Sequence, residues 1–291
     1  MSPVVSKLGL GAAQLRFESA PGMRGRSPEA EIGEVLAVAA RSGVGVLDAA
    51  VPYDGAEATL GDAMPAGAPF RIMVKTARCD RGPDFVEAQA RASLRRLGVA
   101  SADAIIVQSA GDLFGRHGPA LWDKLNDLKD QGLFEKIGVS AIASDDPVGL
   151  ARRFRPDILQ APASLVDQRL LASGALAAVA EMGVEVHLRS IFLQGLLFLP
   201  PDRMPAPLKD AASSLSRVRR MIAEGRSDPL QAALGFALAR PEASAVIVGV
   251  TSAAELSAVV AAAASPPPEL DWGGMAMNDP AALDSHRWAA A

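Results

Sequence analysis

The sequence of 291 residues contains one cysteine, Cys79, and only 4% of its residues are aromatic. One cysteine cannot form an intrachain disulfide or a cysteine-based metal cluster, so the cytoplasm is the expected compartment. The three histidines show no metal-ligand spacing, and we expect no metal site. Because aromatic residues are sparse and there is no basic run, a nucleic acid is not an expected partner.

A long hydrophobic run is also missing. The most apolar stretch, residues 191–199, is interrupted by Gln194 and is too short to cross a bilayer. Residues 1–10 lack the apolar core of an export signal. We therefore expect a cytoplasmic protein without a membrane partner, and the sequence does not indicate its oligomeric state.

Short apolar runs alternate regularly with amphipathic segments. Strands are predicted at residues 8–12, 44–48, 71–75, 104–108, 136–140, 158–161, 184–189 and 245–249. Helices are predicted at residues 28–41, 56–64, 84–97, 119–131, 147–154, 170–182, 229–239 and 253–264. Eight alternating units favour an α/β fold, a closed (β/α)8 TIM barrel that forms one domain over residues 1–291.

Two segments depart from this alternation. An extra helix is predicted after strand 7, at residues 208–224, and the proline-rich residues 200–207 before it should cross the C-terminal rim as a loop. Residues 265–291 contain three consecutive prolines near their start and have little periodicity. We expect them to form a C-terminal tail that follows the surface.

Polar residues end six of the predicted strands. They are Asp48, Lys75, Gln108, Ser140, Gln160 and Arg189. In a barrel of this kind, the C-terminal strand ends surround the active site. One polar residue at a strand end is usually a cap or a loop residue, but six on one face favour a functional site.

The segment that follows the second strand resembles a motif of the aldo-keto reductase superfamily. It contains Asp48, then Tyr53 five residues later, then Glu57 and the pair Leu60-Gly61. Similar landmarks occur in the expected order at residues 8–11 with Gln14, 74–76, 137–140 and 194–195. The resemblance covers the whole chain, and it implies a barrel that reduces carbonyl groups with NAD(P)H.

The resemblance implies that Tyr53 is the acid–base residue and that Lys75 and Asp48 assist it. Reduction of a carbonyl by hydride needs a proton donor, and a phenol with a pKa near about 10 is a poor donor without a nearby cation. Lys75 would be that cation, and Asp48 would keep the ammonium charged and fixed. The alternative is a purely structural Asp48–Lys75 ion pair that Tyr53 covers.

The resemblance also implies cofactor contacts at three strand ends and in one loop. Ser140, Gln160 and Ser164 resemble the side chains that hydrogen-bond the nicotinamide carboxamide. The alternative is that they are core amide and hydroxyl groups whose hydrogen bonds are made within the protein. Arg189 stands where many relatives have an aromatic ring that stacks on the nicotinamide.

Arg189 also belongs to a charged set on the seventh predicted strand. It follows Glu185 and His187 at a spacing of two residues, so all three should point into the barrel. Ion pairing within this set, stacking of Arg189 on the cofactor, and contact of Arg189 with an anionic or polyhydroxy substrate are all open.

The loop after the eighth strand is the expected nucleotide-phosphate site. Gly249, Thr251 and Ser252 lead into a helix whose free N–H groups would receive a phosphate. Relatives that prefer NADPH usually have basic side chains here, whereas this chain has Glu255, which fits a capping box with Ser252. A carboxylate repels a 2'-phosphate and accepts a hydrogen bond from a ribose hydroxyl, so we expect NAD(H) to be preferred over NADP(H).

Gln108 stands where the family usually has a histidine. An amide donates hydrogen bonds, but it neither titrates near neutral pH nor relays a proton as imidazole does. Gln108 therefore indicates weakened or altered reduction, unless it fills the same volume without consequence. His117 and His286 are expected at the surface and His187 deep in the barrel, so none of them replaces the missing histidine.

Two functions follow from these observations. The first is a cytoplasmic NAD(P)H-dependent oxidoreductase that acts on a carbonyl or alcohol group of a small polar molecule, such as a sugar derivative. The second is a barrel with altered catalysis, which senses nucleotides, binds a partner or transfers protons without redox chemistry.

Overall fold

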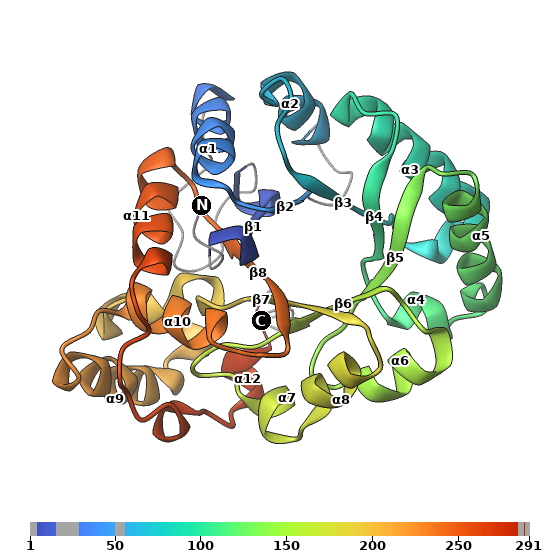
Figure 1. Ribbon diagram of the computed structural model, residues 1–291. Helices are drawn as coiled ribbons and strands as arrows, with labels where there is room; N and C mark the ends of the chain where they lie inside the picture. The colour runs from blue at the N-terminus through green and yellow to red at the C-terminus, as the bar shows by residue number, and fades with distance from the viewer. Residues whose placement is uncertain (1–4, 16–28, 50–55, 285–287, 289–291) are drawn as a thin grey trace.

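The computed structural model describes residues 5–15, 29–49, 56–284 and 288. In these residues, eight parallel strands close into a barrel in chain order, and β1 pairs with both β2 and β8 (Figure 1). The strands are β1 (Leu8–Gly11), β2 (Val46–Asp48), β3 (Arg71–Lys75), β4 (Ala102–Val107), β5 (Phe134–Ser140), β6 (Ile158–Pro162), β7 (Glu185–Arg189) and β8 (Ala243–Gly249). The predicted (β/α)8 barrel is confirmed.

Helices surround the barrel (Figure 1). They are α1 (Glu29–Ser42), α2 (Ala56–Ala63), α3 (Pro83–Leu97), α4 (Gly111–Phe114), α5 (Gly118–Asp130), α6 (Pro147–Phe154), α7 (Arg169–Ala172), α8 (Ala175–Glu181), α9 (Ala211–Glu224), α10 (Pro229–Leu238), α11 (Ala253–Ala264) and α12 (Pro280–Leu283). The helix predicted at residues 170–182 is divided into α7 and α8, because Gly174 has a left-handed φ of 73°. The short helix α4 was not predicted.

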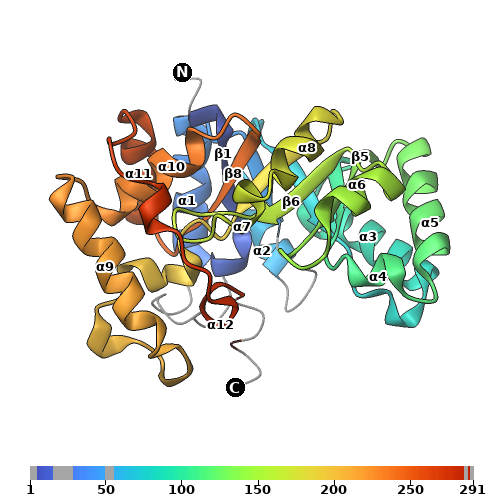
Figure 2. The same cartoon turned by 90° about the horizontal axis from the view of Figure 1, so that it is seen from below.

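The two segments that depart from the alternation contain helices in their described residues. The extra helix after strand 7 is α9, which Figures 1 and 2 place on the outer flank of the barrel beside α10. The predicted loop at residues 200–207 contains the 3-10 helix η5 (Pro201–Arg203) and the start of η6 (Ala206–Leu208), and a further 3-10 helix, η4 (Leu193–Phe198), precedes it. In the described part of the tail, Met275, Met277 and Leu283 are buried against the body of the protein, so this part follows the surface as predicted.

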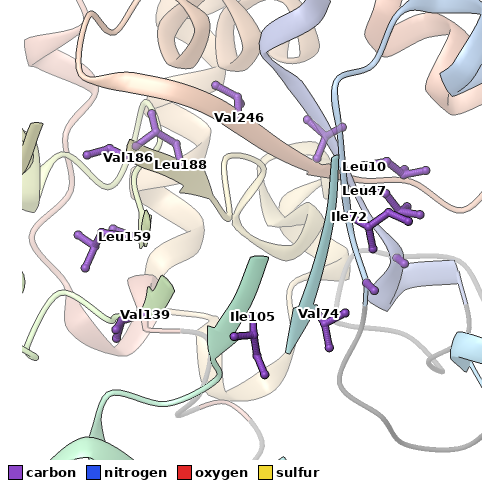
Figure 3. Close-up of a cluster of buried hydrophobic side chains, with 14 of the residues drawn as sticks. Leu10, Leu47, Ile72, Val74, Ile105, Val139, Leu159, Val186, Leu188 and Val246 are labelled. Carbon is purple, nitrogen blue, oxygen red and sulfur yellow. The ribbon is translucent and has the colours of Figure 1, made fainter. Parts of the chain in front are cut away.

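Strand residues alternate between two hydrophobic layers. The outward layer packs against the helices and includes Leu10, Leu47, Ile72, Val74, Ile105, Val139, Leu159, Val186, Leu188 and Val246 (Figure 3). The inward layer fills the barrel and consists of Val46, Met73, Ala104, Ile106, Ile158, Ala245 and Ile247. Asp48 and Lys75 continue this inward layer by two residues, so the strands carry both side chains to the mouth of the barrel.

The same alternation places the charged set of β7 inside. Val186 and Leu188 belong to the outward layer, so Glu185, His187 and Arg189 lie on the inner face, as predicted. His187 is fully buried, and neither of its ring nitrogens has a hydrogen-bond partner in the described residues. Its Nε2 lies 3.6 Å from Glu185 Oε2, longer than an ordinary hydrogen bond but close enough for an electrostatic interaction with this carboxylate.

The second half of the family-like motif has a packing role. The Glu57 side chain is buried and accepts hydrogen bonds from Arg96 Nε at 2.8 Å and Nη2 at 2.6 Å. A Cβ atom on Gly61 would lie 2.3 Å from the Arg96 carbonyl oxygen, so only glycine permits this approach of α2 to α3. The motif therefore fixes α2 against α3, directly after residues 50–55.

Candidate active site

A cleft of about 1060 Å³ opens at the C-terminal ends of the barrel strands. Its lining includes the six polar residues that end the predicted strands, namely Asp48, Lys75, Gln108, Ser140, Gln160 and Arg189. The cleft continues along the loop after β7 to Gly249, Thr251 and Glu255 at the start of α11. One site therefore brings together residues from β2 to β8 that are far apart in the sequence.

A buried network of three side chains forms the floor of the cleft. Lys75 Nζ lies 2.8 Å from Asp48 Oδ1. Gln160 contacts both partners, because its Oε1 accepts a hydrogen bond from Lys75 Nζ and its Nε2 donates one to Asp48 Oδ1 over 3.2 Å. Gln160 is fully buried, and the Lys75 side chain is only 8% exposed.

The carboxylate of Asp48 influences two buried cations, Lys75 by direct contact and Arg189 through its charge. Burial lowers the pKa of Lys75 below its ordinary value; the nearby Asp48 opposes this effect and Arg189 adds to it. Burial also lowers the pKa of Arg189, while Asp48 and other carboxylates favour the charged guanidinium. A lysine in such a setting holds its proton less firmly than one at the surface, which is a common property of functional sites.

Arg189 and Ser140 line the cleft with unused polar atoms. Arg189 Nη2 donates to the Ala141 carbonyl oxygen at 2.7 Å, whereas its buried Nε has no partner in the described residues. Ser140 is buried, and its hydroxyl makes no hydrogen bond within the described part of the chain. Ser164 does not join the site, because its Oγ accepts hydrogen bonds from the backbone amides of Val166 and Asp167.

Gln108 lies one residue beyond β4. Its backbone N–H donates to Thr76 Oγ1 at 3.1 Å, which ties the end of β4 to the loop after β3. The residue lines the cleft, as predicted. Tyr53 lies outside the described residues, so its approach to Lys75 stays a prediction.

Side-chain oxygens accept hydrogen bonds from backbone N–H groups at the N-terminus of α11. Ser252 Oγ accepts from the Glu255 N–H at 3.2 Å, which is one half of the predicted capping box. The Glu255 carboxylate bonds the Thr251 N–H at 2.7 Å and the Thr251 hydroxyl at 3.0 Å, one residue before the expected N-cap amide. Glu31 from α1 accepts from the Ala253 N–H at 2.6 Å. The expectation of free N–H groups is therefore wrong for these three amides.

Residues 190–195, all of which except Leu193 line the cleft after β7, adopt an unusual backbone. The left-handed residues are Ser190 at φ 61°, Leu193 at φ 50°, Gln194 at φ 52° and Gly195 at φ 81°. Such a conformation costs non-glycine residues energy, and it is most often retained at functional sites. The sequence analysis identified Gln194-Gly195 only as a family landmark and did not predict this backbone conformation, because serine and leucine carry no signal for a left-handed conformation.

Comparisons with known proteins agree with this geometry. A model described as the aldo/keto reductase family matches residues 7–273. The chain therefore belongs to this family of NAD(P)H-dependent oxidoreductases, which act on small carbonyl compounds. No curated protein matches the sequence.

Solved structures share the fold. The holo form of aldo-keto reductase AKR11C1 from Bacillus halodurans has 21% sequence identity and a TM-score of 0.72, with 90% of this chain and 87% of that chain covered. PA4992 from Pseudomonas aeruginosa, described as an aldo-keto reductase, has 20% identity and a TM-score of 0.67, with 89% and 90% covered. At this identity the likeness shows the barrel alone. None of the helices in the described ranges is long and apolar enough to cross a membrane.

Proposed function

We propose that the protein reduces a carbonyl group, or oxidises an alcohol group, of a small polar molecule such as a sugar derivative. The observation that carries this proposal is the buried Asp48–Lys75 ion pair, which lies at the C-terminal mouth of the barrel. The cleft above it, at about 1060 Å³, slightly exceeds the usual size of ligand pockets, about 300–1,000 Å³. It is large enough for a dinucleotide beside a small substrate.

The chain's own residues divide the proton chemistry between them. Tyr53 donates a proton to the carbonyl oxygen in reduction and accepts it in oxidation. Lys75 stabilises the phenolate that Tyr53 becomes, and Asp48 holds the Lys75 ammonium in place. A bound nicotinamide would supply the hydride in its reduced form, and in its oxidised form it would accept the hydride of an alcohol.

The lining of the cleft fits a nicotinamide dinucleotide. The buried Ser140 hydroxyl has no partner in the described residues and is suited to a carboxamide. Arg189 lies at the end of β7 and also lines the cleft. Its guanidinium would stack on the nicotinamide ring or contact an anionic part of the substrate. At the far end of the cleft, Gly249 and Thr251 would face the nucleotide. Ser252 does not line the cleft but caps the adjoining N-terminus of α11.

Two carboxylates support a preference for NAD(H). Glu255 and Glu31 both lie at the N-terminus of α11, where they accept hydrogen bonds from Thr251 and Ala253. A 2'-phosphate placed there would meet two negative charges and would have to displace them from these amides. A ribose 2'-hydroxyl would instead donate to a carboxylate.

A second candidate function is nucleotide binding with weak or altered catalysis. Gln108 favours it, because this residue lines the cleft in place of the family's usual histidine. Gln108 would orient a substrate oxygen without relaying a proton. A non-redox proton transfer by Tyr53 and Lys75 belongs to the same candidate.

Titration with NADH and NADPH tests the proposed function first. We expect both nucleotides to bind, with NADH the tighter, and the bound complex to reduce small polar aldehydes or ketones. Binding without turnover of any carbonyl would favour the second candidate. Failure of both nucleotides to bind would refute the proposed function.

A further inference from the structure

Arg78 lines the cleft from the loop after β3, three residues beyond Lys75. Gln108 and Ser109, which follow β4, line the cleft as well. We propose that Arg78 is an anion subsite, which binds a carboxylate or phosphate group of the substrate and thereby selects anionic carbonyl compounds. This inference rests on the proposed function, because it names the substrate class of the same cleft.

The position of Arg78 separates it from the expected site of the cofactor phosphates. The strands follow chain order around the barrel, so β3 and β4 lie across it from β7 and β8 (Figure 1). The nucleotide end of the cleft, at Gly249 and Glu255, follows β8. Arg78 lies on the other side, near Lys75, so an anion bound there would belong to the substrate rather than to the cofactor.

Asp112 holds the Arg78 side chain in place. Arg78 Nη2 lies 3.0 Å from Asp112 Oδ1, and Asp112 Oδ2 accepts a hydrogen bond from the Cys79 N–H at 3.4 Å. The Asp112 side chain is only 8% exposed, which makes it a fixed anchor. The guanidinium is therefore oriented before a ligand arrives, and this lowers the entropy cost of binding.

The ion pair uses only part of the guanidinium. A guanidinium has five N–H donors, and in the described part of the chain Nε and Nη1 of Arg78 have no partner. The Arg78 side chain is 56% exposed, whereas its partner carboxylate is buried behind it. The two free nitrogens are thus available to a second oxyanion.

The wall of the cleft around Arg78 presents no opposing charge. The loops after β3 and β4 contribute Arg78, Gln108, Ser109 and Gly111 to the lining. None of these described residues is acidic, and Asp112 does not belong to the lining. The Gln108 amide and the Ser109 hydroxyl are neutral groups that also donate hydrogen bonds. An oxyanion here would meet a cation and neutral donors, a combination that favours charge-assisted hydrogen bonds.

The other two cations of the described lining are less available than Arg78. Lys75 is 8% exposed and is paired with Asp48. Arg189 is partly buried and interacts electrostatically with three carboxylates, including Asp48. Arg78 combines a single carboxylate partner with the largest exposure of the three, so it is the cation best placed for a substrate anion.

Matched pairs of aldehydes test the proposal at saturating NADH. Succinic semialdehyde is compared with butanal, and glyceraldehyde 3-phosphate with glyceraldehyde. We expect kcat/KM to favour the anionic member of at least one pair by about tenfold or more, and the pair with the larger preference identifies carboxylate or phosphate. Arg78→Gln should reduce this preference by about tenfold, mainly through KM, whereas Arg78→Lys should retain part of it because the charge remains.

Arg116→Gln is the control for the change in net charge. Arg116 is exposed between α4 and α5 and does not line the cleft, so this variant should keep the preference for the anionic aldehyde. The dissociation constant of NADH should stay within about threefold in Arg78→Gln. If Arg78→Gln does not fold, because Asp112 has lost its counter-ion, the double variant with Asp112→Asn replaces it, and the same loss of preference is expected.

Three results would overturn the anion subsite. The first is equal turnover of anionic and neutral aldehydes by the unmodified protein. The second is a preference that survives Arg78→Gln, which would assign the anion to Arg189, or one that is lost equally in Arg116→Gln. The third is a tenfold or greater loss of NADH affinity in Arg78→Gln, which would place a cofactor phosphate at Arg78.

Calorimetry with succinate and with inorganic phosphate separates this proposal from the proposed function. If no aldehyde is turned over, the proposed function fails, but binding of either anion that weakens fivefold or more in Arg78→Gln would still support the subsite. Equal binding by the two proteins, or no binding by either, would refute it.

Discussion

The barrel interior holds a charged cluster at each end, and the two clusters are similar in composition. At the base, Glu185 pairs with Lys136 and lies 3.5 Å from Arg71. At the mouth, Asp48 pairs with Lys75 and attracts Arg189. Each cluster thus has one carboxylate and two cations, so the residue types alone do not distinguish a structural cluster from a functional one.

Burial distinguishes them. The side chains of Arg71 and Glu185 are 39% and 28% exposed, whereas those of Lys75 and Asp48 are 8% and 13% exposed. At the base, His187, Lys136 and Arg71 lower the pKa of Glu185 to about 2, which favours its charged form. At the mouth, burial lowers the pKa of Lys75, which disfavours its charged form. We therefore expect the base to stabilise the fold, whereas the buried lysine at the mouth is the group to which the proposed function assigns a part in proton transfer.

The largest expected effect is at the mouth. Tyr53→Phe removes one hydroxyl, and we expect turnover to fall by about a hundredfold or more, the scale for loss of a positioned general acid. The melting temperature should change little. Steady-state kinetics and thermal unfolding of the same preparation measure both quantities, and normal turnover by the variant would contradict the assignment of Tyr53.

The base should show the reverse pattern. Because the pKa of Glu185 is lowered in the folded state, its carboxylate contributes stability above the unfolded value near 4.5 and loses it as the pH falls towards 2. We expect Glu185→Gln to lower the free energy of unfolding by about 1–2 kcal/mol at pH 7, after allowance for solvent screening, and to leave turnover intact. Denaturant titrations between pH 7 and pH 3 should show this difference shrinking below pH 4.5.

Glu135→Gln is the matched control for the base. Glu135 is exposed on β5, carries the same charge, and has no ion pair within the described residues. It should change stability by much less than Glu185→Gln at every pH. Equal effects of the two substitutions, or a difference that does not depend on pH, would show that the base cluster is not a stabilising device.

The fold and the six strand ends could be predicted from the sequence because alternation and strand-final polar residues are local signals. The pairing of Asp48 with Lys75 was instead implied by the resemblance to the aldo-keto reductases. The contact of Gln160 with both was not predicted, since it depends on where β6 faces β2 and β3 across the barrel. Glu31 was missed because it reaches Ala253 over 222 positions of the chain, and no local pattern encodes that distance.

The substitution Gln108→His tests whether the missing imidazole limits catalysis at the mouth of the barrel. If the absence of an imidazole weakens proton movement, Gln108→His should raise the reduction of simple activated aldehydes by about tenfold, or roughly 1.4 kcal/mol of transition-state stabilisation. Turnover of an aldehyde series by the two proteins measures this. Lower activity on the true substrate, with unchanged cofactor affinity, would instead make glutamine the native positioning group.

The smallest expected effect lies at the N-terminus of α11, at the far end of the cleft. Here the charge of the side chains is expected to decide which cofactor binds more tightly. Glu255 bonds the Thr251 backbone and hydroxyl, so a 2'-phosphate at this turn would meet a fixed negative charge. Glu255→Arg reverses that charge, and we expect it to narrow the ratio of NADPH to NADH dissociation constants severalfold, the scale of about 1 kcal/mol or less for exposed charges. Glu31→Gln should narrow the ratio less, because it removes a charge without adding a cation. Tighter binding of NADPH than of NADH by the unmodified protein would refute the assignment of these carboxylates.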